Sequence, residues 1–281
     1  MNSINLTIHN KGFLIDRVLD GIFKNSVLPF ELIIVLDGCT DDTETKVVEY
    51  LANNHCKVIR GFNILYTDDV FETKANNKAF RASTGDFCIV VQDDCVIKEF
   101  AWDERILKPF KAFHDVFAVS GNCAHNREVN PNSKDIAELH FSGFQKLLTP
   151  PKDWCDILNH IHHAKANNTP RDIFAVRDSV NRGPLAINRL DLVEMGYLDE
   201  AFAPQESDDH DLMYRMQKKL GKVCGFYGVE FESLPAWGGT RNTDGTTKHW
   251  MFAANHKNTR LLYERHKDVF ANQRIENRIL R

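Results

Sequence analysis

Short apolar runs and helical periods alternate along the first 120 residues of the chain. Residues 31–36 and 86–91 are apolar runs of strand length, and the segments between such runs repeat apolar residues every three or four positions. We expect strands at residues 4–8, 31–36, 57–60, 63–66, 86–91 and 116–120, and helices at residues 13–23, 41–51, 72–83 and 101–113. This alternation predicts an α/β fold, Rossmann-like, with a mostly parallel, mixed sheet and helices on both faces.

The second half of the chain is less regular. Residues 125–180 are polar and rich in Asn, Pro and His. Beyond them we expect strands at residues 182–187, 222–227 and 229–234, and helices at residues 189–195, 207–220 and 251–266. No linker separates the halves, so we expect a single domain over residues 1–281 whose C-terminal portion shapes a substrate site.

Composition narrows the classes of function. The formal net charge is -4 and 43% of the residues are apolar, so the chain can fill a core and lacks the basic excess of a nucleic-acid-binding protein. An anionic substrate would need a metal ion or a few well-placed cations. The seven cysteines form no C-x-x-C pair, which indicates reduced thiols and a cytoplasmic location.

Membrane segments are not expected. No apolar stretch approaches the roughly 18 residues of a membrane span, and the first residues do not resemble a secretory signal. Peripheral contact with a membrane stays open, and the sequence says nothing of the oligomeric state.

Two acidic groups stand at the ends of strands of the predicted sheet. Asp93 and Asp94 follow the run at 86–91, and Asp37 closes the run at 31–36. Ligands of such sheets bind beyond the carboxyl ends of the strands, so these acids share one rim. Adjacent carboxylates suit Mg2+ or Mn2+ shared with substrate phosphates, although a solvated turn is the plain alternative.

Asp37 allows three interpretations. Its carboxylate can accept from a base N–H or a ribose hydroxyl, or it can form a turn before a helix capped by Thr40 or Asp41. A haloacid dehalogenase nucleophile would need a second Asp two residues later, and Cys39 stands there instead.

The helix expected at residues 207–220 carries a further acid on its apolar side. Asp209 is in helical phase with Leu212, Met213 and Met216, so it begins the buried stripe. Asp211 forms an ordinary i,i+4 pair with Arg215. An inward acid suggests a catalytic base or an acceptor-binding group, whereas attraction to the helix dipole is the plain alternative.

Histidines and a tryptophan are weaker candidates. His249 or His256, after a glycine-rich loop, can complete a metal site or contact phosphate, but an exposed position is the usual one. The His-rich run at residues 160–163 is interpreted as an exposed face. Trp237, beside two glycines, either stacks on a sugar or fills core.

These motifs together resemble the GT-A fold glycosyltransferases of family 2. The similar segments, in the order of that family's motifs, are residues 6–10, 36–42, 77–87, 92–94, 182–187 and 208–212. They are similar to the Tyr-Asn strand, the Asp-Asp-Gly-Ser-Thr-Asp loop, the Arg-Asn-x-Gly helix, the Asp-x-Asp motif, the strand before the acceptor helix and the Glu-Asp-x-Glu-Leu motif. His9 replaces the Tyr, and Asn76 stands where Arg is usual.

The resemblance implies a role for each half. Residues 1–120 would bind the nucleotide and residues 121–281 the acceptor. Implied donor-binding residues are Thr7, Asn10, Asp37, Asn77, Asp93 and Arg182; implied metal ligands are Asp94 and His249; the implied catalytic residue is Asp209. Thr7 and Asp37 would hold the base, Asp93 the ribose, and Asp94 the Mn2+ or Mg2+ ion. Asp209 would deprotonate an acceptor hydroxyl, which predicts inversion.

The implied partners are a nucleotide sugar, with UDP the commonest nucleotide, and a saccharide or glycoconjugate acceptor. One rival is a sugar-phosphate nucleotidyltransferase, which needs a Gly-rich, Arg-containing loop after the first strand. Residues 10–13 do not form such a loop. The other rival is a non-catalytic nucleotide-sugar-binding protein, against which the intact Asp94 and Asp209 argue.

Overall fold

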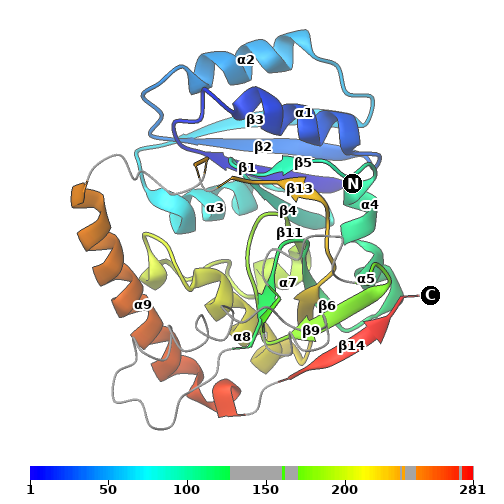
Figure 1. Cartoon of the computed structure of the whole chain (residues 1–281), viewed down its shortest axis with the longest axis vertical. Coiled ribbons are helices and arrows are strands. Elements are labelled where there is room, and N and C mark those ends of the chain that lie inside the picture. Colours follow the sequence, from blue (N-terminus) through cyan, green and yellow to red (C-terminus); the bar gives the residue numbers. More distant parts are fainter. Residues whose placement is uncertain (127–159, 162–169, 235, 238–244, 272–273, 281) are drawn as a thin grey trace.

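A nine-stranded sheet forms the centre of the molecule (Figure 1). The computed structural model describes residues 1–126, 160–161, 170–234, 236–237, 245–271 and 274–280. The strand order is β14-β9-β12-β6-β11-β4-β1-β2-β3, and β11 and β9 run opposite to the others. The predicted α/β fold with a mostly parallel sheet is therefore confirmed.

The strands of this sheet are β1 (Asn2–Ile8), β2 (Phe30–Asp37), β3 (Ile59–Thr67), β4 (Phe87–Gln92), β6 (Val116–Ser120), β9 (Ile173–Arg177), β11 (Leu185–Asn188), β12 (Val223–Phe226) and β14 (Glu276–Ile279). Two smaller sheets pair β5 (Val96–Ile97) with β13 (Phe231–Glu232), and β7 (Ala124–His125) with β8 (His160–Ile161) and β10 (Ser179–Val180).

Helices cover both faces of the central sheet (Figure 1). They are α1 (Ile15–Asn25), α2 (Thr43–Asn53), α3 (Phe71–Ala82), α4 (Trp102–Ile106), α5 (Lys108–Ala112), α7 (Arg189–Glu194) and α8 (Asp208–Leu220). The long helix α9 (Gly245–Ala271) packs against α8 instead of the sheet. Side chains alternate along β2, so Leu32 and Ile34 pack in the same core as α1 while Ile33 and Val35 pack against α3. Both faces are apolar because both are covered.

Some predicted elements differ from the observed ones. The helix expected at residues 101–113 is two short helices, α4 and α5, because Pro109 in the first turn of α5 has no N–H with which to continue a single helix. The two short strands expected at 57–60 and 63–66 are the single strand β3, which pairs along its length with β2. Strands β9 and β14 were not predicted, and β9 lies in the segment expected to be irregular.

The pair of Asp211 and Arg215 is not an ordinary surface pair. Arg215 Nε donates to Asp211 at 2.7 Å as expected, but Asp211 is fully buried and also hydrogen-bonds His266 of α9, with 2.9 Å between the atoms. The prediction missed this burial because α9, which covers the polar side of α8, is distant in sequence.

The carboxyl ends of β1, β2 and β4 lie at one edge of the sheet, and the beginning of antiparallel β11 lies beside them. This edge carries the cavities described below. Within the described residues, no helix is both long and apolar enough to cross a bilayer. The six cysteines described there are free thiols.

Candidate functional site

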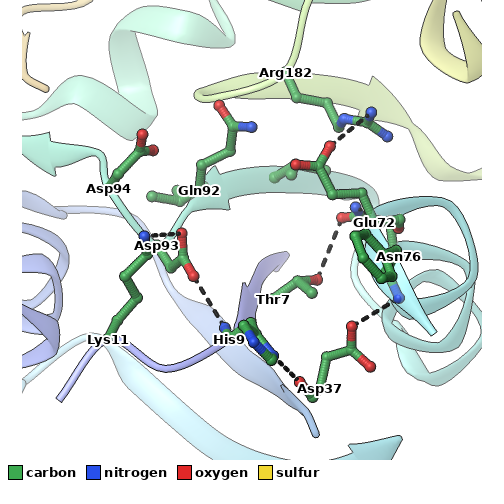
Figure 2. A pocket seen from close by; sticks show the side chains of 13 residues that line it. Thr7, His9, Lys11, Asp37, Glu72, Asn76, Gln92, Asp93, Asp94 and Arg182 are labelled. Atoms are coloured by element: carbon green, nitrogen blue, oxygen red, sulfur yellow. Dashed lines mark hydrogen bonds and ion pairs between the residues drawn. The ribbon is translucent and has the colours of Figure 1, made fainter. Parts of the chain in front are cut away.

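The first cavity lies at the carboxyl ends of β1, β2 and β4 and has a volume of about 180 Å3. Figure 2 shows Lys11, Asp93 and Asp94 on one side, and Glu72, Asn76 and Arg182 on the other. Its lining comprises Thr7, His9, Lys11, Asp37, Phe71, Glu72, Asn76, Val90, Val91, Gln92, Asp93, Asp94 and Arg182. Five of the residues that the sequence singled out, Thr7, Asp37, Asp93, Asp94 and Arg182, are thus brought together.

Asp37 joins the end of β2 to the start of α3. Its carboxylate accepts hydrogen bonds from the Thr67 hydroxyl at 2.8 Å and from the backbone N–H groups of Val70 and Phe71 at 2.7 and 2.8 Å. The next residue, Gly38, has a φ of +58°, and a Cβ there would lie 2.7 Å from that of Asp69. The sharp turn therefore needs glycine, and Asp37 fixes the loop that leads into α3.

Asp93 has the closer protein partners of the two acids. Its carboxylate accepts the His9 backbone N–H at 3.0 Å and lies 3.9 Å from Lys11 Nζ. Burial raises the pKa of Asp93 to about 7, although Lys11 and the His9 N–H lower it. Lys11 itself lies at the cavity and donates to the Trp237 carbonyl, so it is a fixed cation at the cavity wall.

Asp94 lines the first cavity with few protein partners. The Ser233 hydroxyl is 3.5 Å from one of its carboxylate oxygens, the long limit of a hydrogen bond. Among the described side chains, no three His, Cys, Asp or Glu residues converge on a metal site. Mg2+ and Mn2+ take hard oxygen ligands and often complete their coordination with water and substrate phosphates. Asp94 fits such a shared ion, whereas the side chain of His249 lies outside the described residues.

Arg182 is held between two acids at the boundary of the cavity. Its guanidinium donates to both carboxylate oxygens of Asp208, at 2.8 and 2.9 Å, and to Glu72 at 3.1 Å. Burial by itself would lower the pKa of Arg182, but the surrounding carboxylates raise it well above its ordinary range. Burial also raises the pKa of Glu72, against the opposing charge of Arg182. The arginine charge is therefore largely balanced by the protein itself.

A second cavity, of about 250 Å3, adjoins the first and shares Glu72, Gln92 and Arg182 with it. Its other lining residues are Asn122, Asn181, Gln205, Glu206, Ser207, Asp209 and His210. Gln92 reaches both cavities beside Gly183, whose φ is +77° and where a Cβ would lie 2.4 Å from the Gln92 Oε1. The two cavities therefore meet at one set of side chains.

Asp209 lies in the second cavity, at the start of α8. Its side chain is 11% exposed, and its Oδ1 accepts the His210 backbone N–H at 2.9 Å and lies 3.9 Å from His210 Nε2. The residue is buried with Leu212, Met213 and Met216, as the helical stripe predicted. A carboxylate at a cavity wall can accept a proton from a bound hydroxyl.

Asn10 and Asn77 do not line the first cavity. Asn10 Oδ1 accepts the Thr40 backbone N–H at 2.7 Å and so ties the end of β1 to the loop after β2. Asn77 is fully buried and exchanges two hydrogen bonds with the backbone of Leu198. It is the preceding Asn76 that lines the cavity, where its Oδ1 lies 3.4 Å from the Thr7 hydroxyl.

Eight of the thirteen lining residues were not among the predicted site residues, and the polar ones of these eight are His9, Lys11, Glu72, Asn76 and Gln92. Lys11 comes shortly after β1, which ends at Ile8, so the sequence already indicated a cation near this edge of the sheet. Glu72 precedes Asn76 by one helical turn and therefore shares its face. Trp237, left open above, packs against the core, with the Arg17 guanidinium 4.6 Å from its ring centre.

Comparison with known proteins supplies the family. The family model described as Glycosyl transferase family 2 matches residues 3–170. No curated protein matches the chain by sequence.

Several solved structures share the fold. A mannosyltransferase from Pyrobaculum calidifontis in complex with GDP-Man and Mn2+ has a TM-score of 0.56 at 15% identity, over 86% of this chain and 58% of that one. Glucosyl-3-phosphoglycerate synthase from Mycobacterium tuberculosis, with Mn2+, UDP and phosphoglyceric acid, has a TM-score of 0.54 at 14% identity, over 100% of this chain and 87% of that one. TarS of S. aureus has a TM-score of 0.51 at 12% identity, over 83% of this chain but 36% of its own.

Proposed function

Because the chain belongs to glycosyl transferase family 2, we propose that it transfers a sugar from a nucleotide-sugar donor to a hydroxyl group of an acceptor. The observation that carries this proposal is the pair of adjoining cavities. One contains the Asp93–Asp94 pair, the other contains Asp209, and they share Glu72, Gln92 and Arg182. A sugar carried by a nucleotide in the first cavity can thus reach an acceptor in the second.

The nucleoside diphosphate binds in the first cavity. Thr7 and Asp37 line its inner part and hold the base, and Asp93 contacts the ribose. Lys11 is the nearby cation that attracts the diphosphate, since its Nζ lies 3.9 Å from Asp93 and at the cavity wall. The relatives solved with UDP or GDP-Man support a donor with either of these nucleotides, and UDP is our first choice.

Asp94 holds the divalent ion, Mn2+ or Mg2+. When bound, the ion supplies positive charge that stabilises the leaving diphosphate. Two of the relatives were solved with Mn2+, and the carboxylate oxygens of Asp94 are ligands of the kind that this ion takes; both support the assignment. His249 remains a proposed further ligand.

Asp209 acts as the general base. It accepts the proton of the acceptor hydroxyl while that oxygen forms a bond to the anomeric carbon of the sugar. The bond from the anomeric carbon to the diphosphate oxygen breaks, and its electron pair leaves with the nucleoside diphosphate. Attack from the second cavity, on the side opposite the diphosphate in the first, inverts the anomeric configuration.

Proton NMR of the transfer product tests the proposal. The protein is incubated with Mn2+, UDP- or GDP-sugars and saccharide acceptors, and the anomeric coupling of the product is compared with that of the donor. We expect a glycoside of inverted configuration and one nucleoside diphosphate per transfer. Retention would refute the base role of Asp209, and release of pyrophosphate from a nucleoside triphosphate and a sugar phosphate would indicate a nucleotidyltransferase. Donor binding without any turnover would indicate a non-catalytic protein.

A further inference from the structure

The second cavity is lined by hydrogen-bonding side chains of a particular kind. Three carboxylates, Glu72, Glu206 and Asp209, face it together with four primary amides, those of Gln92, Asn122, Asn181 and Gln205. Carboxylates offer only acceptor oxygens at neutral pH, and amides offer one acceptor and two N–H donors. The lining therefore suits a ligand whose groups both donate and accept hydrogen bonds, as hydroxyls do, and its carboxylates favour groups that donate.

The positive charge of Arg182 in this lining is already neutralised by neighbouring carboxylates. Arg182 is the one lysine or arginine among the described residues of the cavity, and Asp208 and Glu72 hold its guanidinium through three hydrogen bonds. Asp208 is completely buried, so this ion pair does not open to solvent. A phosphate or carboxylate in the cavity would have to compete with Asp208 for the arginine and would face Glu206 and Asp209.

Two polar atoms beside the cavity are buried and have no partner: Asn122 Oδ1 and the Ser207 hydroxyl. The Asn122 amide nitrogen donates to the Arg182 carbonyl at 3.2 Å, which fixes the orientation of the amide and leaves its oxygen as the unpaired atom. A buried acceptor without a partner costs free energy unless a ligand supplies a donor. A hydroxyl or an ammonium group can supply it, whereas an ionised phosphate or carboxylate cannot.

Resting on the proposed function, we propose that the second cavity takes a saccharide acceptor whose reacting hydroxyl is flanked by further hydroxyls or an amino group, and that it excludes acceptors bearing phosphate or carboxylate there. The acceptor class is thus uncharged or cationic. Glu206 sets this preference at the cavity mouth, because it is exposed while its backbone is fixed. Its carbonyl and that of Gln205 both accept from the buried amide of Asn258 in α9, at 3.3 and 2.7 Å.

A matched panel of acceptors tests the proposal. Methyl hexosides, 2-amino-2-deoxyhexoses, hexuronates and hexose 6-phosphates of gluco, galacto and manno configuration are compared at equal concentration. Acceptor-dependent release of nucleoside diphosphate is measured, and saturation-transfer NMR with UDP and Mn2+ present measures binding. We expect the hydroxyl-rich and amino acceptors to be used at least about tenfold better than the anionic ones, since like charges in an interface are strongly disfavoured.

Charge reversal at the mouth sharpens the test. Glu206→Lys should shift the ratio of anionic to neutral acceptor use upward by about tenfold through KM, and Glu206→Gln by less. Glu194→Lys, which reverses an exposed acid on α7 beside Lys219, is the matched control and should leave the ratio unchanged. Equal or better use of the anionic acceptors by the unmodified protein would overturn the proposal, as would binding of none of the probes with UDP present. Failure of the proposed function itself is distinguishable, because none of the acceptors, neutral or anionic, would then release nucleoside diphosphate from a bound or unbound donor.

Discussion

The two cavities share three side chains yet handle charge in opposite ways. In the first, Lys11 lies at the wall beside Asp93, and the hydrogen-bond partner of Asp94 among the described residues is the distant Ser233 hydroxyl. In the second, Arg182 is neutralised by Asp208 and Glu72, and the remaining lining is carboxylate and amide apart from Ser207 and His210. The first cavity is therefore suited to an anion that arrives with a metal ion, and the second to a ligand rich in hydrogen-bond donors.

This difference in charge gives a physical reason why a diphosphate and an acceptor would bind in separate cavities. A diphosphate that entered the second cavity would meet Glu206 and Asp209 without a free guanidinium, whereas in the first it would meet Lys11 and, in the proposed assignment, an ion on Asp94. Sugar transfer needs only the sugar to cross the boundary at Glu72, Gln92 and Arg182. Variants that affect one cavity should accordingly leave binding in the other intact.

The largest effect is expected from Asp209→Asn. Without a base, transfer should fall roughly a hundred- to ten-thousandfold, the usual contribution of general base catalysis. Affinity for the nucleoside diphosphate, measured by calorimetry, should not change, because Asp209 does not line the first cavity. Asp86→Asn, at an exposed acid beside the N-terminus, is the matched control and should transfer normally. Normal turnover by Asp209→Asn would remove it as the base.

Asp94→Asn should affect the first cavity alone. We expect the Mn2+-dependent part of nucleoside diphosphate binding to fall by about a hundredfold, since loss of even an outer partner of a metal site often costs ten to a hundredfold. Binding without metal should match that of the unmodified protein in the same titration. If the variant kept full Mn2+ dependence, the ion would have to be held elsewhere.

Lys11→Met removes a cation from the first cavity. Nucleoside diphosphate binding should weaken by about tenfold with or without metal, because a hydrogen bond to a charged group is lost. Calorimetry with the diphosphate and with the bare nucleoside separates the two contributions, and only the diphosphate should be affected. Lys24→Met is the control, since Lys24 is exposed on α1 and pairs with Asp20. Equal losses in both variants would point to a general charge effect instead.

The smallest effect is expected from Thr7→Val, a change of nearly equal volume. Loss of one hydrogen bond to the base should weaken UDP or GDP binding by about fivefold, or about 1 kcal/mol. Affinity for inorganic pyrophosphate should stay the same, because it has no base. Thr45→Val on the exposed side of α2 is the matched control. A loss of pyrophosphate binding would show that Thr7 acts on the phosphates or on the shape of the cavity.

The first cavity was largely predictable from sequence because strand ends determine it. Thr7, Asp37 and Asp93 lie at or just beyond the ends of β1, β2 and β4, and parallel strands bring their carboxyl ends to one edge. The sequence did not show which residue of a helix faces the cavity. Asn76 and Asn77 are neighbours in α3, yet one lines the cavity and the other binds the Leu198 backbone.

The second cavity could not be predicted in the same way, since loops far apart in the sequence build it. Glu206 and Ser207 have φ values of +74° and +66°, which no local residue pattern indicated. The amide of Asn258, about fifty residues later in the chain, donates hydrogen bonds to the carbonyls of this loop. Local sequence signals, such as those of a phosphate-binding loop, do not indicate a contact at this separation. Of its lining, the sequence singled out Arg182, through the family resemblance, and Asp209, whose helical phase with the apolar stripe could be counted.

The division between the two cavities is tested most directly by a crystal structure with Mn2+ and UDP or GDP bound. We predict that the anomalous signal of Mn2+ lies within coordination distance of the Asp94 carboxylate, with the diphosphate beside Lys11 and the second cavity free of nucleotide. A nucleotide bound against Asp209 and Glu206, or a Mn2+ ion away from Asp94, would contradict the account.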